Sequence, residues 1–456
     1  MPLSINPATG ETLGTYPYLQ DAEIEGALAR AHRANATWGA MTFAERAVPM
    51  LAAATLLRFD KAKLARTITL EMGKPIAESE AEIDKSAWNC EFVAEHAESW
   101  LADTLVPTNA KTSYVSHLPL GTVLAVLPWN FPVWQIFRCA VSLLMAGNTV
   151  LLKHAPNVAG CAQLITTLML KAGFPVGAFE NLMAPVEKIG RVITDPRVAG
   201  VTLTGSPAAG AAVAAQAGAA CKKTVLELGG SDAFIVLDDA DLEGAVSAAV
   251  RARFANCGQV CLAAKRFIVT PGIAEAFETR LASEVAQLRR GDPLDRTTQI
   301  GPLARADLRE ALHGLVTESV AAGARPLVGG NAQAGRGFYY EPTVLAGATE
   351  KMPVVSQETF GPVAAILRAR NAEDAAVIAN NSRYGLSSAI WSRDVDRARS
   401  LARRIEAGGV FINSVSASDP RMPVGGVKLS GYGRELGVAG IKEWVNQQSV
   451  WIGPSA

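Results

Sequence analysis

Cysteine and histidine are scarce in this chain, and neither is arranged as a metal site. The sequence holds 6 cysteines and 5 histidines among 456 residues, with no C-x-x-C pair and no H-E-x-x-H motif. Zinc sites need such clustered ligands, and a disulfide scaffold needs a higher density of cysteine. We therefore expect free thiols and no metal in the site.

The chain also lacks an excess of charge of one sign, a secretory leader and a membrane-spanning run. Lys and Arg number 43, as do Asp and Glu, so no long-range field favours nucleic acid or an anionic membrane. Residues 1–14 are polar and turn-rich, unlike a signal peptide. Apolar stretches such as 139–152 are shorter than the roughly 18 to 20 uncharged residues that span a bilayer. These absences predict a cytoplasmic protein with a small-molecule partner, binding neither nucleic acid nor membrane.

Hydrophobic periodicity suggests how the chain is organised. A length of 456 residues suggests roughly two or three domains. From 21 to about 100 the apolar residues recur at helical spacing, whereas 101–120 has the β-branched character of an exposed arm. Strand-like and helix-like runs then alternate, up to 228 and again from 231, which predicts an α/β fold with mostly parallel sheets. The tail KEWVNQQSVWIG alternates like an edge strand that could pair with a partner chain.

Three short motifs carry residues of chemical interest, and each alone is a weak signal. NCGQVC ends at Cys261, although a cysteine is more often a small buried residue than a nucleophile. ELGG puts Glu227 at the end of a buried strand, where open α/β sheets present ligands, but an exposed strand-end charge has the same pattern. PWNFP holds Asn130 between two prolines after an apolar strand, and a structural turn explains it about as well.

In this order the three motifs resemble the aldehyde dehydrogenase superfamily, and the chain is most similar to its succinate semialdehyde dehydrogenase branch. The similarity extends to LLKHAP, VTLTGSPAAG, ETFGP and GGVKLSG, over nearly the whole chain. It implies an aldehyde dehydrogenase-like α/β fold, with two doubly wound open-sheet domains and a small β oligomerisation arm. The implied domains are an NAD(P)-binding domain at 1–100 and 119–228, a catalytic domain at 229–432, and the arm at 101–118 and 433–456.

The chemistry that the resemblance implies uses three catalytic residues, Cys261, Glu227 and Asn130. The Cys261 thiolate would add to the aldehyde carbon, and the Asn130 amide with the Cys261 backbone N–H would stabilise the oxyanion. Hydride transfer to the nicotinamide would leave a thioester, which water activated by Glu227 would hydrolyse. Cys257, one helical turn away, could form a reversible disulfide with Cys261, but a buried thiol is the simpler interpretation.

The resemblance also implies an NAD or NADP site without the usual G-x-G-x-x-G fingerprint. The glycine spacing after Thr204 fits a P-loop, but two alanines stand where Lys-Ser/Thr would be needed. The N–H groups at that helix start suit the pyrophosphate, and Lys153 would reach the adenine ribose. Pro156 stands where NAD-preferring relatives often carry Glu, so both cofactors are expected to work. The implied cofactor-binding residues are Pro128, Trp129, Lys153, Pro156, Thr204, Gly205, Ser206, Leu228, Gly229, Glu358 and Phe360.

Arg138 is a lone arginine on an apolar stretch, eight residues after Asn130. It could form a structural ion pair, or it could grip a distal carboxylate of the substrate. Similarity to the succinate semialdehyde branch favours the second interpretation, since that branch places an arginine here and a serine at the position of Ser418. A second arginine of that branch is replaced by Ala255, and a common phenylalanine by Val424. The implied substrate-binding residues are Arg138, Ser418, Trp134 and Gln135.

Three other functions remain open at this level. A non-specific aldehyde dehydrogenase would share every catalytic residue, and a thioester-forming hydrolase or acyltransferase would share the cysteine but usually needs a histidine base. A binding protein on the same scaffold would predict loss of a catalytic residue. A homodimer or homotetramer is expected, because the arm and the C-terminal strand are suited to pairing between subunits.

Overall fold

Four helices form the N-terminal region, as the helical periodicity predicts. The computed structural model describes residues 3–453; the outermost residues of the predicted ranges 1–100 and 433–456 lie outside it. The hairpin β1 (Leu3–Ile5) and β2 (Thr12–Thr15) comes first. The helices that follow are α1 (Asp21–Ala40), α2 (Phe43–Phe59), α3 (Lys61–Met72) and α4 (Ile76–Leu101).

The first alternating series builds a six-stranded sheet in the order β19-β9-β8-β5-β6-β7. Its strands are parallel except for β19, which pairs antiparallel with β9. The strands are β5 (Thr122–Leu127), β6 (Thr149–His154), β7 (Phe179–Asn181), β8 (Val198–Thr204), β9 (Lys223–Glu227) and β19 (Gly431–Tyr432). The connecting helices are α5 (Trp134–Met145), α6 (Ala159–Lys171), α7 (Val186–Thr194) and α8 (Pro207–Ala219), with a 3-10 turn at Pro156–Val158.

The second series builds a seven-stranded sheet in the order β12-β13-β14-β11-β10-β16-β17, parallel except for β12. Its strands are β10 (Asp232–Val236), β11 (Ala264–Val269), β12 (Arg325–Val328), β13 (Thr343–Ala346), β14 (Val363–Arg368), β16 (Ser387–Trp391) and β17 (Gly409–Ile412). Its helices are α9 (Leu242–Phe254), α10 (Pro271–Ala286), α11 (Ala306–Ala321), α12 (Pro353–Ser356), α13 (Ala372–Asn380) and α14 (Val395–Ala402).

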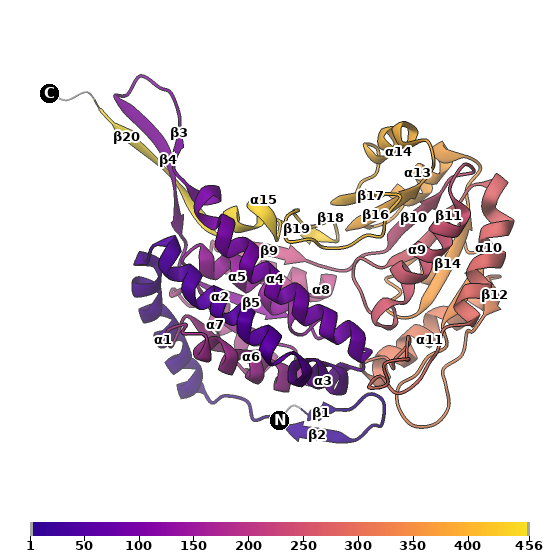
Figure 1. Cartoon of the computed structure of the whole chain (residues 1–456), viewed down its shortest axis with the longest axis horizontal. Helices are drawn as coiled ribbons and strands as arrows, with labels where there is room; N and C mark the ends of the chain where they lie inside the picture. The colour runs from indigo at the N-terminus through magenta and orange to yellow at the C-terminus, as the bar shows by residue number, and fades with distance from the viewer. Residues whose placement is uncertain (1–2, 454–456) are drawn as a thin grey trace.

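The two sheets lie in two lobes, from which a thin arm projects (Figure 1). The arm consists of β3 (Thr104–Leu105), β4 (Thr112–Pro119) and β20 (Val445–Ile452), with β4 in the centre. Smaller elements near its base and between the lobes are β15 (Tyr384–Gly385), β18 (Val427–Lys428) and α15 (Gly437–Lys442). The C-terminal strand thus pairs within its own chain along one edge, and its other edge is open.

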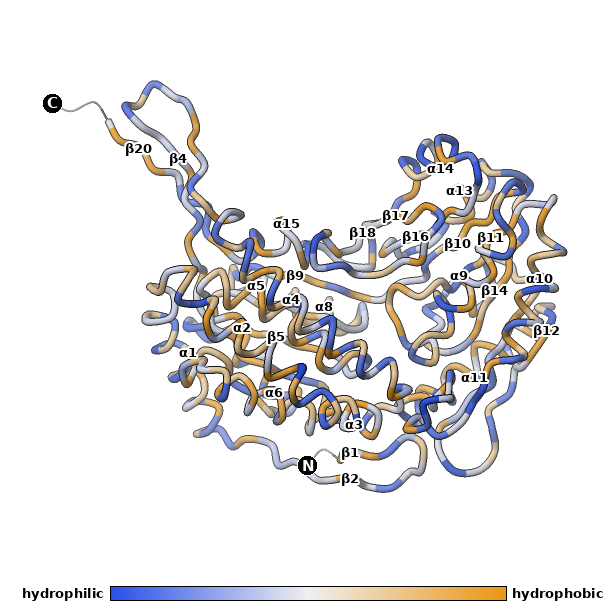
Figure 2. The backbone as a smooth tube through the Cα atoms, viewed as in Figure 1, coloured by the Kyte–Doolittle hydropathy of each residue, from blue (hydrophilic) through white to orange (hydrophobic). Residues whose placement is uncertain are grey.

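Alternation along the central strands explains why the first sheet is covered on both faces. In β5, Val123 and Ala125 belong to the core shared with α2 to α6, whereas Leu124 belongs to the core shared with α1, α7 and α8. A sheet buried on both faces needs such a continuous apolar run. Figure 2 shows the resulting hydrophobic strands inside both lobes, and a mixture of polar and hydrophobic residues along the arm. Among residues 3–453 no single helix is long and apolar enough to cross a membrane; only α1 and α2 together pass that test, bent by 119°.

Candidate active site

Cys261 lies in a strained segment between α9 and β11. The 3-10 turn Ala255–Gly258 precedes it, and Asn256 and Cys257 have φ values of 50° and 53° in the left-handed region. Gly258 also has φ 71°, and a Cβ on it would collide with the backbone oxygen of Gly361. Strain of this kind persists only where the surroundings enforce it, and it is common at active sites.

Two buried charged residues hold this catalytic loop in place. The guanidinium of Arg253 donates to the Gly258 and Gly361 carbonyls, at 2.6 Å each, and so ties the loop to the ETFGP segment. Glu78 of α4 accepts from the Asn256 backbone N–H at 2.7 Å. Burial raises the pKa of Glu78 to about 7, against the opposing effects of Lys74 and this hydrogen bond. The loop is therefore fixed from both lobes.

Asn130 joins the PWNFP turn, which follows β5, to the same loop. Its Nδ2 donates to the Gln259 carbonyl at 3.0 Å, and Asn256 donates back to the Asn130 carbonyl at 2.8 Å. The Asn130 Oδ1 is buried without a hydrogen-bond partner among residues 3–453. The predicted oxyanion donor thus contacts Gln259, which precedes Cys261 by two residues.

Glu227 ends β9 and is buried beside two other charged groups. One of its carboxylate oxygens lies 3.9 Å from Arg138, whose Nε forms an ion pair with Glu435. Its other oxygen is buried and lacks a hydrogen-bond partner in the described chain. Burial raises the pKa of Glu227 to about 8; Arg138 lowers it and Glu435 raises it further. A carboxyl group with a pKa near neutrality suits a general base.

Arg138 is therefore already matched by negative charge within the protein. Its guanidinium also donates to the Thr204 hydroxyl at 3.0 Å, and the residue is only 2% exposed. Burial lowers the pKa of Arg138, but Glu435 and Glu227 outweigh it and the net shift is upward. This arrangement agrees with the ion-pair interpretation, while the side chain still lines the cavity described below.

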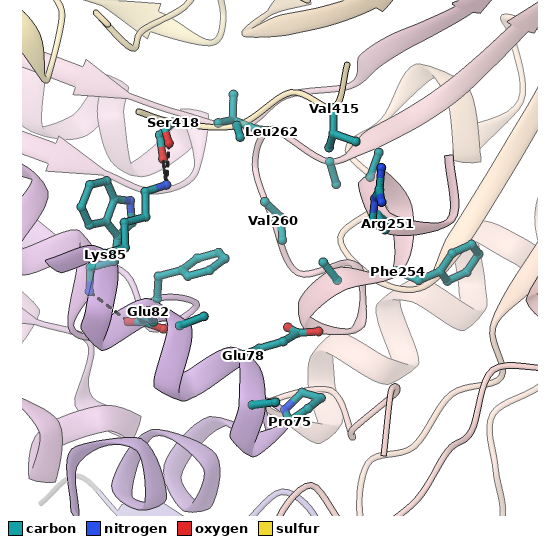
Figure 3. Close-up of a pocket in the computed structure, with 18 of the residues that line it drawn as sticks. Pro75, Glu78, Glu82, Lys85, Arg251, Phe254, Val260, Leu262, Val415 and Ser418 are labelled. Atoms are coloured by element: carbon teal, nitrogen blue, oxygen red, sulfur yellow. Dashed lines mark hydrogen bonds between the residues drawn. The ribbon is translucent and has the colours of Figure 1, made fainter. Parts of the chain in front are cut away.

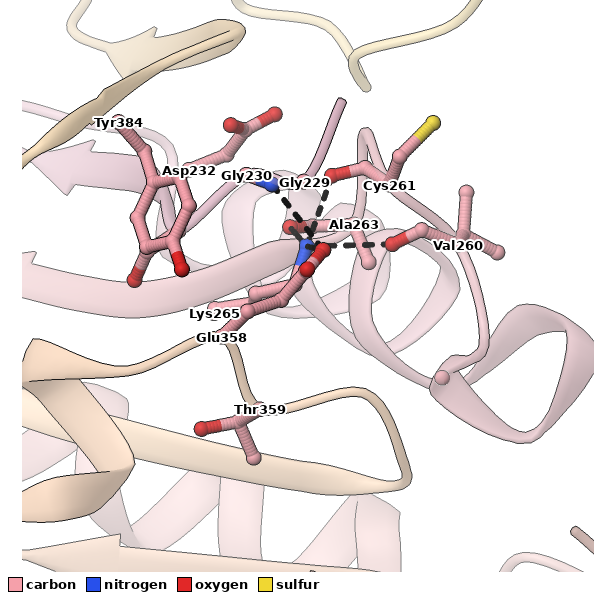
Figure 4. A network of polar contacts seen from close by, with 12 residues as sticks. Gly229, Gly230, Asp232, Val260, Cys261, Ala263, Lys265, Glu358, Thr359 and Tyr384 are labelled. Carbon is pink, nitrogen blue, oxygen red and sulfur yellow. Dashed lines mark hydrogen bonds and ion pairs between the residues drawn. The ribbon is translucent and has the colours of Figure 1, made fainter. Parts of the chain in front are cut away.

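Cys261 is partly exposed, whereas Cys257 is buried. Burial raises the pKa of the Cys261 thiol to about 11, although the positive charges of Arg138 and Lys265 lower it. The thiol needs a base or a bound cofactor's positive charge to ionise near neutral pH. Lys265 Nζ donates to the Cys261 carbonyl at 2.7 Å, and the sulfur points away from that network (Figure 4).

Glu358 lies on the other side of the Lys265 network (Figure 4). It accepts from the Gly230 N–H at 3.0 Å and lies 3.9 Å from Lys265. A Cβ on residue 229 would overlap the Glu358 carboxylate, so the Glu358 side chain can lie here only because residue 229 is a glycine. Phe360 nearby packs edge-on against Trp129, with ring centroids 5.8 Å apart.

Apart from Glu358 and Phe360, which lie between α12 and β14, the predicted cofactor residues gather at the carboxyl ends of β5, β6, β8 and β9, which are neighbours in the sheet. Ser206 caps α8, accepting from the Ala209 N–H at 3.3 Å. Lys153 is partly buried, burial lowers its pKa, and it forms no hydrogen bond or ion pair with the described residues. Pro156 is exposed at the start of its 3-10 turn. An unpaired cation beside a helix N-terminus suits an anionic, hydroxyl-bearing ligand such as a dinucleotide.

A cavity of about 650 Å³ extends from Cys261 between α4, α5 and α9 (Figure 3). All four predicted substrate residues line it, namely Arg138, Ser418, Trp134 and Gln135. So do Glu82 and Lys85 of α4, which sequence reasoning missed. One pattern in the sequence could have pointed to this face of α4. Four polar residues recur there at helical spacing and are buried, namely Ser79, Glu82, Ser86 and Asn89.

The fold and site define an α/β protein with a partly exposed cysteine near the carboxyl ends of a parallel sheet. The chain belongs to the aldehyde dehydrogenase family, which it matches over residues 3–450. It is 50% identical over 449 residues to succinate semialdehyde dehydrogenase [NAD(P)+] Sad of Escherichia coli (strain K12), covering 98% of this chain and 97% of the relative. It is 46% identical over 449 residues to a probable succinate-semialdehyde dehydrogenase [NADP(+)] of Synechocystis, covering 98% and 99%.

A solved structure gives the same result for the fold. The succinic semialdehyde dehydrogenase of Streptococcus pyogenes, in complex with NADP+, superimposes with a TM-score of 0.97 at 37% identity and covers 100% of both chains. The predicted aldehyde dehydrogenase-like fold and the family resemblance are confirmed. The family also favours an oxidoreductase over the hydrolase or acyltransferase that the sequence left open.

Proposed function

We propose that this enzyme oxidises succinate semialdehyde to succinate with NAD or NADP. The observation that carries the proposal is the cavity beside Cys261, which is lined by Lys85 and Arg138. Lys85 brings into this cavity a cation with no ion-pair partner among the described residues, which suits an aldehyde with a distal carboxylate. The relatives from Escherichia coli and Synechocystis are named as enzymes of the same reaction, a succinate semialdehyde dehydrogenase and a probable one.

The chain's own residues supply the covalent steps. Cys261, after losing its proton to water, adds its sulfur to the aldehyde carbon and forms the anion of a thiohemiacetal. Asn130 and the Cys261 N–H stabilise the oxygen that becomes negative. A bound nicotinamide would supply the acceptor for the hydride that this carbon loses. Glu227 then takes a proton from water, which attacks the resulting thioester, releasing the acid and the Cys261 thiolate.

The first prediction concerns the wild-type protein. Succinate semialdehyde should give reduced nucleotide with a kcat/KM roughly 10- to 100-fold above that of butanal. This ratio corresponds to the binding free energy of one hydrogen bond between charged groups. Butanal has the same chain length without the carboxylate, so it is the matched control. Equal rates with both aldehydes would leave a non-specific aldehyde dehydrogenase and exclude the proposed substrate.

The second prediction concerns the choice of cofactor. Pro156→Glu should reduce kcat/KM for NADP by about tenfold relative to NAD, since a carboxylate near the 2′-phosphate repels it. Pro156→Ala separates loss of the proline ring from the added charge and should leave the NAD to NADP ratio near wild type. An unchanged ratio in the glutamate variant would remove Pro156 from the cofactor site.

We also propose a cytoplasmic enzyme that assembles into a homodimer or homotetramer through the arm. The open edge of β20 and three exposed apolar side chains support this assembly: Leu105 is 73% exposed, Trp451 60% and Ile452 46%. Open strand edges with apolar side chains favour pairing with another chain. Light scattering tests the assembly, and a monomeric mass at working concentration would contradict it.

A further inference from the structure

Lys85 reaches into the cavity from α4 and is held there by two neighbours (Figure 3). Its Nζ donates to the Ser418 hydroxyl at 2.7 Å and to the Ser418 carbonyl at 2.6 Å. The same nitrogen lies 4.5 Å from the centre of the Trp134 ring, within the range of a cation–π contact. The ammonium group is thereby fixed in direction without being neutralised.

The other cations along the cavity differ from Lys85 either in their partners or in their exposure. Arg138 is paired with Glu435 and lies near Glu227. Arg296 is paired with Glu80 at 2.6 Å. Arg251 is exposed and lies across the cavity from Lys85 in Figure 3. Among the described residues Lys85 forms no ion pair, and its hydrogen bonds go to neutral oxygens.

We propose that Lys85, aimed by Ser418 and Trp134, binds the distal carboxylate of the aldehyde and sets the preference for acidic aldehydes. This inference rests on the proposed function and names the residue that carries its specificity. A partly buried ammonium with no internal counter-ion gains most from a carboxylate brought by the substrate, because little water competes there. Ser418 then acts as a positioning residue, and Arg138 serves mainly to hold Glu227 and Glu435.

The charged groups around Lys85 make this contact sensitive to pH. Burial lowers the pKa of Lys85 to about 8; Arg138 lowers it as well, whereas Asp419, Glu82 and Cys261 raise it. Only the protonated lysine attracts a carboxylate, so the preference for the acidic aldehyde should decline as the pH rises through about 8. Glu227 and Cys261 act on every aldehyde, and their titration cancels in the ratio of two substrates.

The test compares kcat/KM for succinate semialdehyde and butanal in four proteins. Lys85→Met keeps the apolar stem and removes the charge, and we expect a loss of about 10- to 100-fold for succinate semialdehyde, mainly in KM, with butanal unchanged. Lys85→Arg restores the charge and should retain most of the preference. Arg251→Met is the matched control, which removes an exposed cation of the same cavity and should keep the wild-type ratio.

A pH series from about 6 to 10 adds an independent readout. The ratio of the two kcat/KM values should fall above about pH 8 in the wild type, in line with the pKa of Lys85. It should stay level in Lys85→Arg, because a guanidinium remains charged. A wild type that prefers succinate semialdehyde and keeps that preference in Lys85→Met overturns the role of Lys85 and leaves the proposed function intact. A wild type with no preference overturns the proposed function itself.

Discussion

Glu227→Gln is expected to release reduced nucleotide once per active site and then stop. The first half of the reaction needs the thiolate of Cys261 and the oxyanion donors, whereas hydrolysis of the thioester needs a base for water. Loss of the base should lower steady-state kcat by roughly 10²- to 10⁴-fold, the usual value of general-base catalysis. Stopped-flow absorbance measures the burst, and mass spectrometry of the quenched protein should detect the acyl group on Cys261.

The pKa of Glu227 gives the same prediction a second readout. Burial raises that pKa to about 8, so the carboxyl is largely protonated at pH 7 and becomes a base above it. Wild-type kcat should therefore rise as pH increases through about 8, and the remaining rate of Glu227→Gln should lack this rise. Cys261→Ala is the control, which should give no burst. A Gln variant with wild-type kcat would assign the base to another group.

The general arrangement of the fold follows from local patterns in the sequence. Alternation of apolar strands and helices indicates both sheets, because each strand of a doubly wound sheet carries a continuous apolar run, as Val123, Leu124 and Ala125 do. The edge strand β12 and its neighbour β13 were not predicted. They have four residues each, and a glycine-containing loop joins them.

The three motifs that place Cys261, Glu227 and Asn130 could be found in the sequence, but their electrostatic partners could not. Lys85 and Ser418 are 333 positions apart in the chain, and nothing local to either residue indicates their hydrogen bond. Arg138 could be seen to need a counter-charge or a ligand, yet the sequence does not say that Glu435 supplies it. Pairings of this kind depend on how the lobes pack, and periodicity in one segment carries no such information.

Arg138→Met is expected to reduce the oxidation of succinate semialdehyde and of butanal alike. Removing one partner of a buried ion pair leaves the other charge uncompensated, at a cost of about 3 to 5 kcal/mol in the free energy of unfolding. Here two buried carboxylates, Glu227 and Glu435, would lose their cation, so the pKa of Glu227 should rise and Glu227 would become a base only at higher pH. Thermal unfolding and kcat against pH measure these effects.

The double variant Arg138→Met with Glu435→Gln separates the loss of an ion pair from the loss of substrate binding. Neutralising Glu435 removes one of the uncompensated charges, so part of the stability and of the butanal activity should return. Lys85 remains in this variant, and the preference for succinate semialdehyde over butanal should remain with it. If Arg138→Met instead unfolds like the wild type, oxidises butanal normally and loses only succinate semialdehyde, then Arg138 binds the carboxylate and Lys85 does not determine specificity.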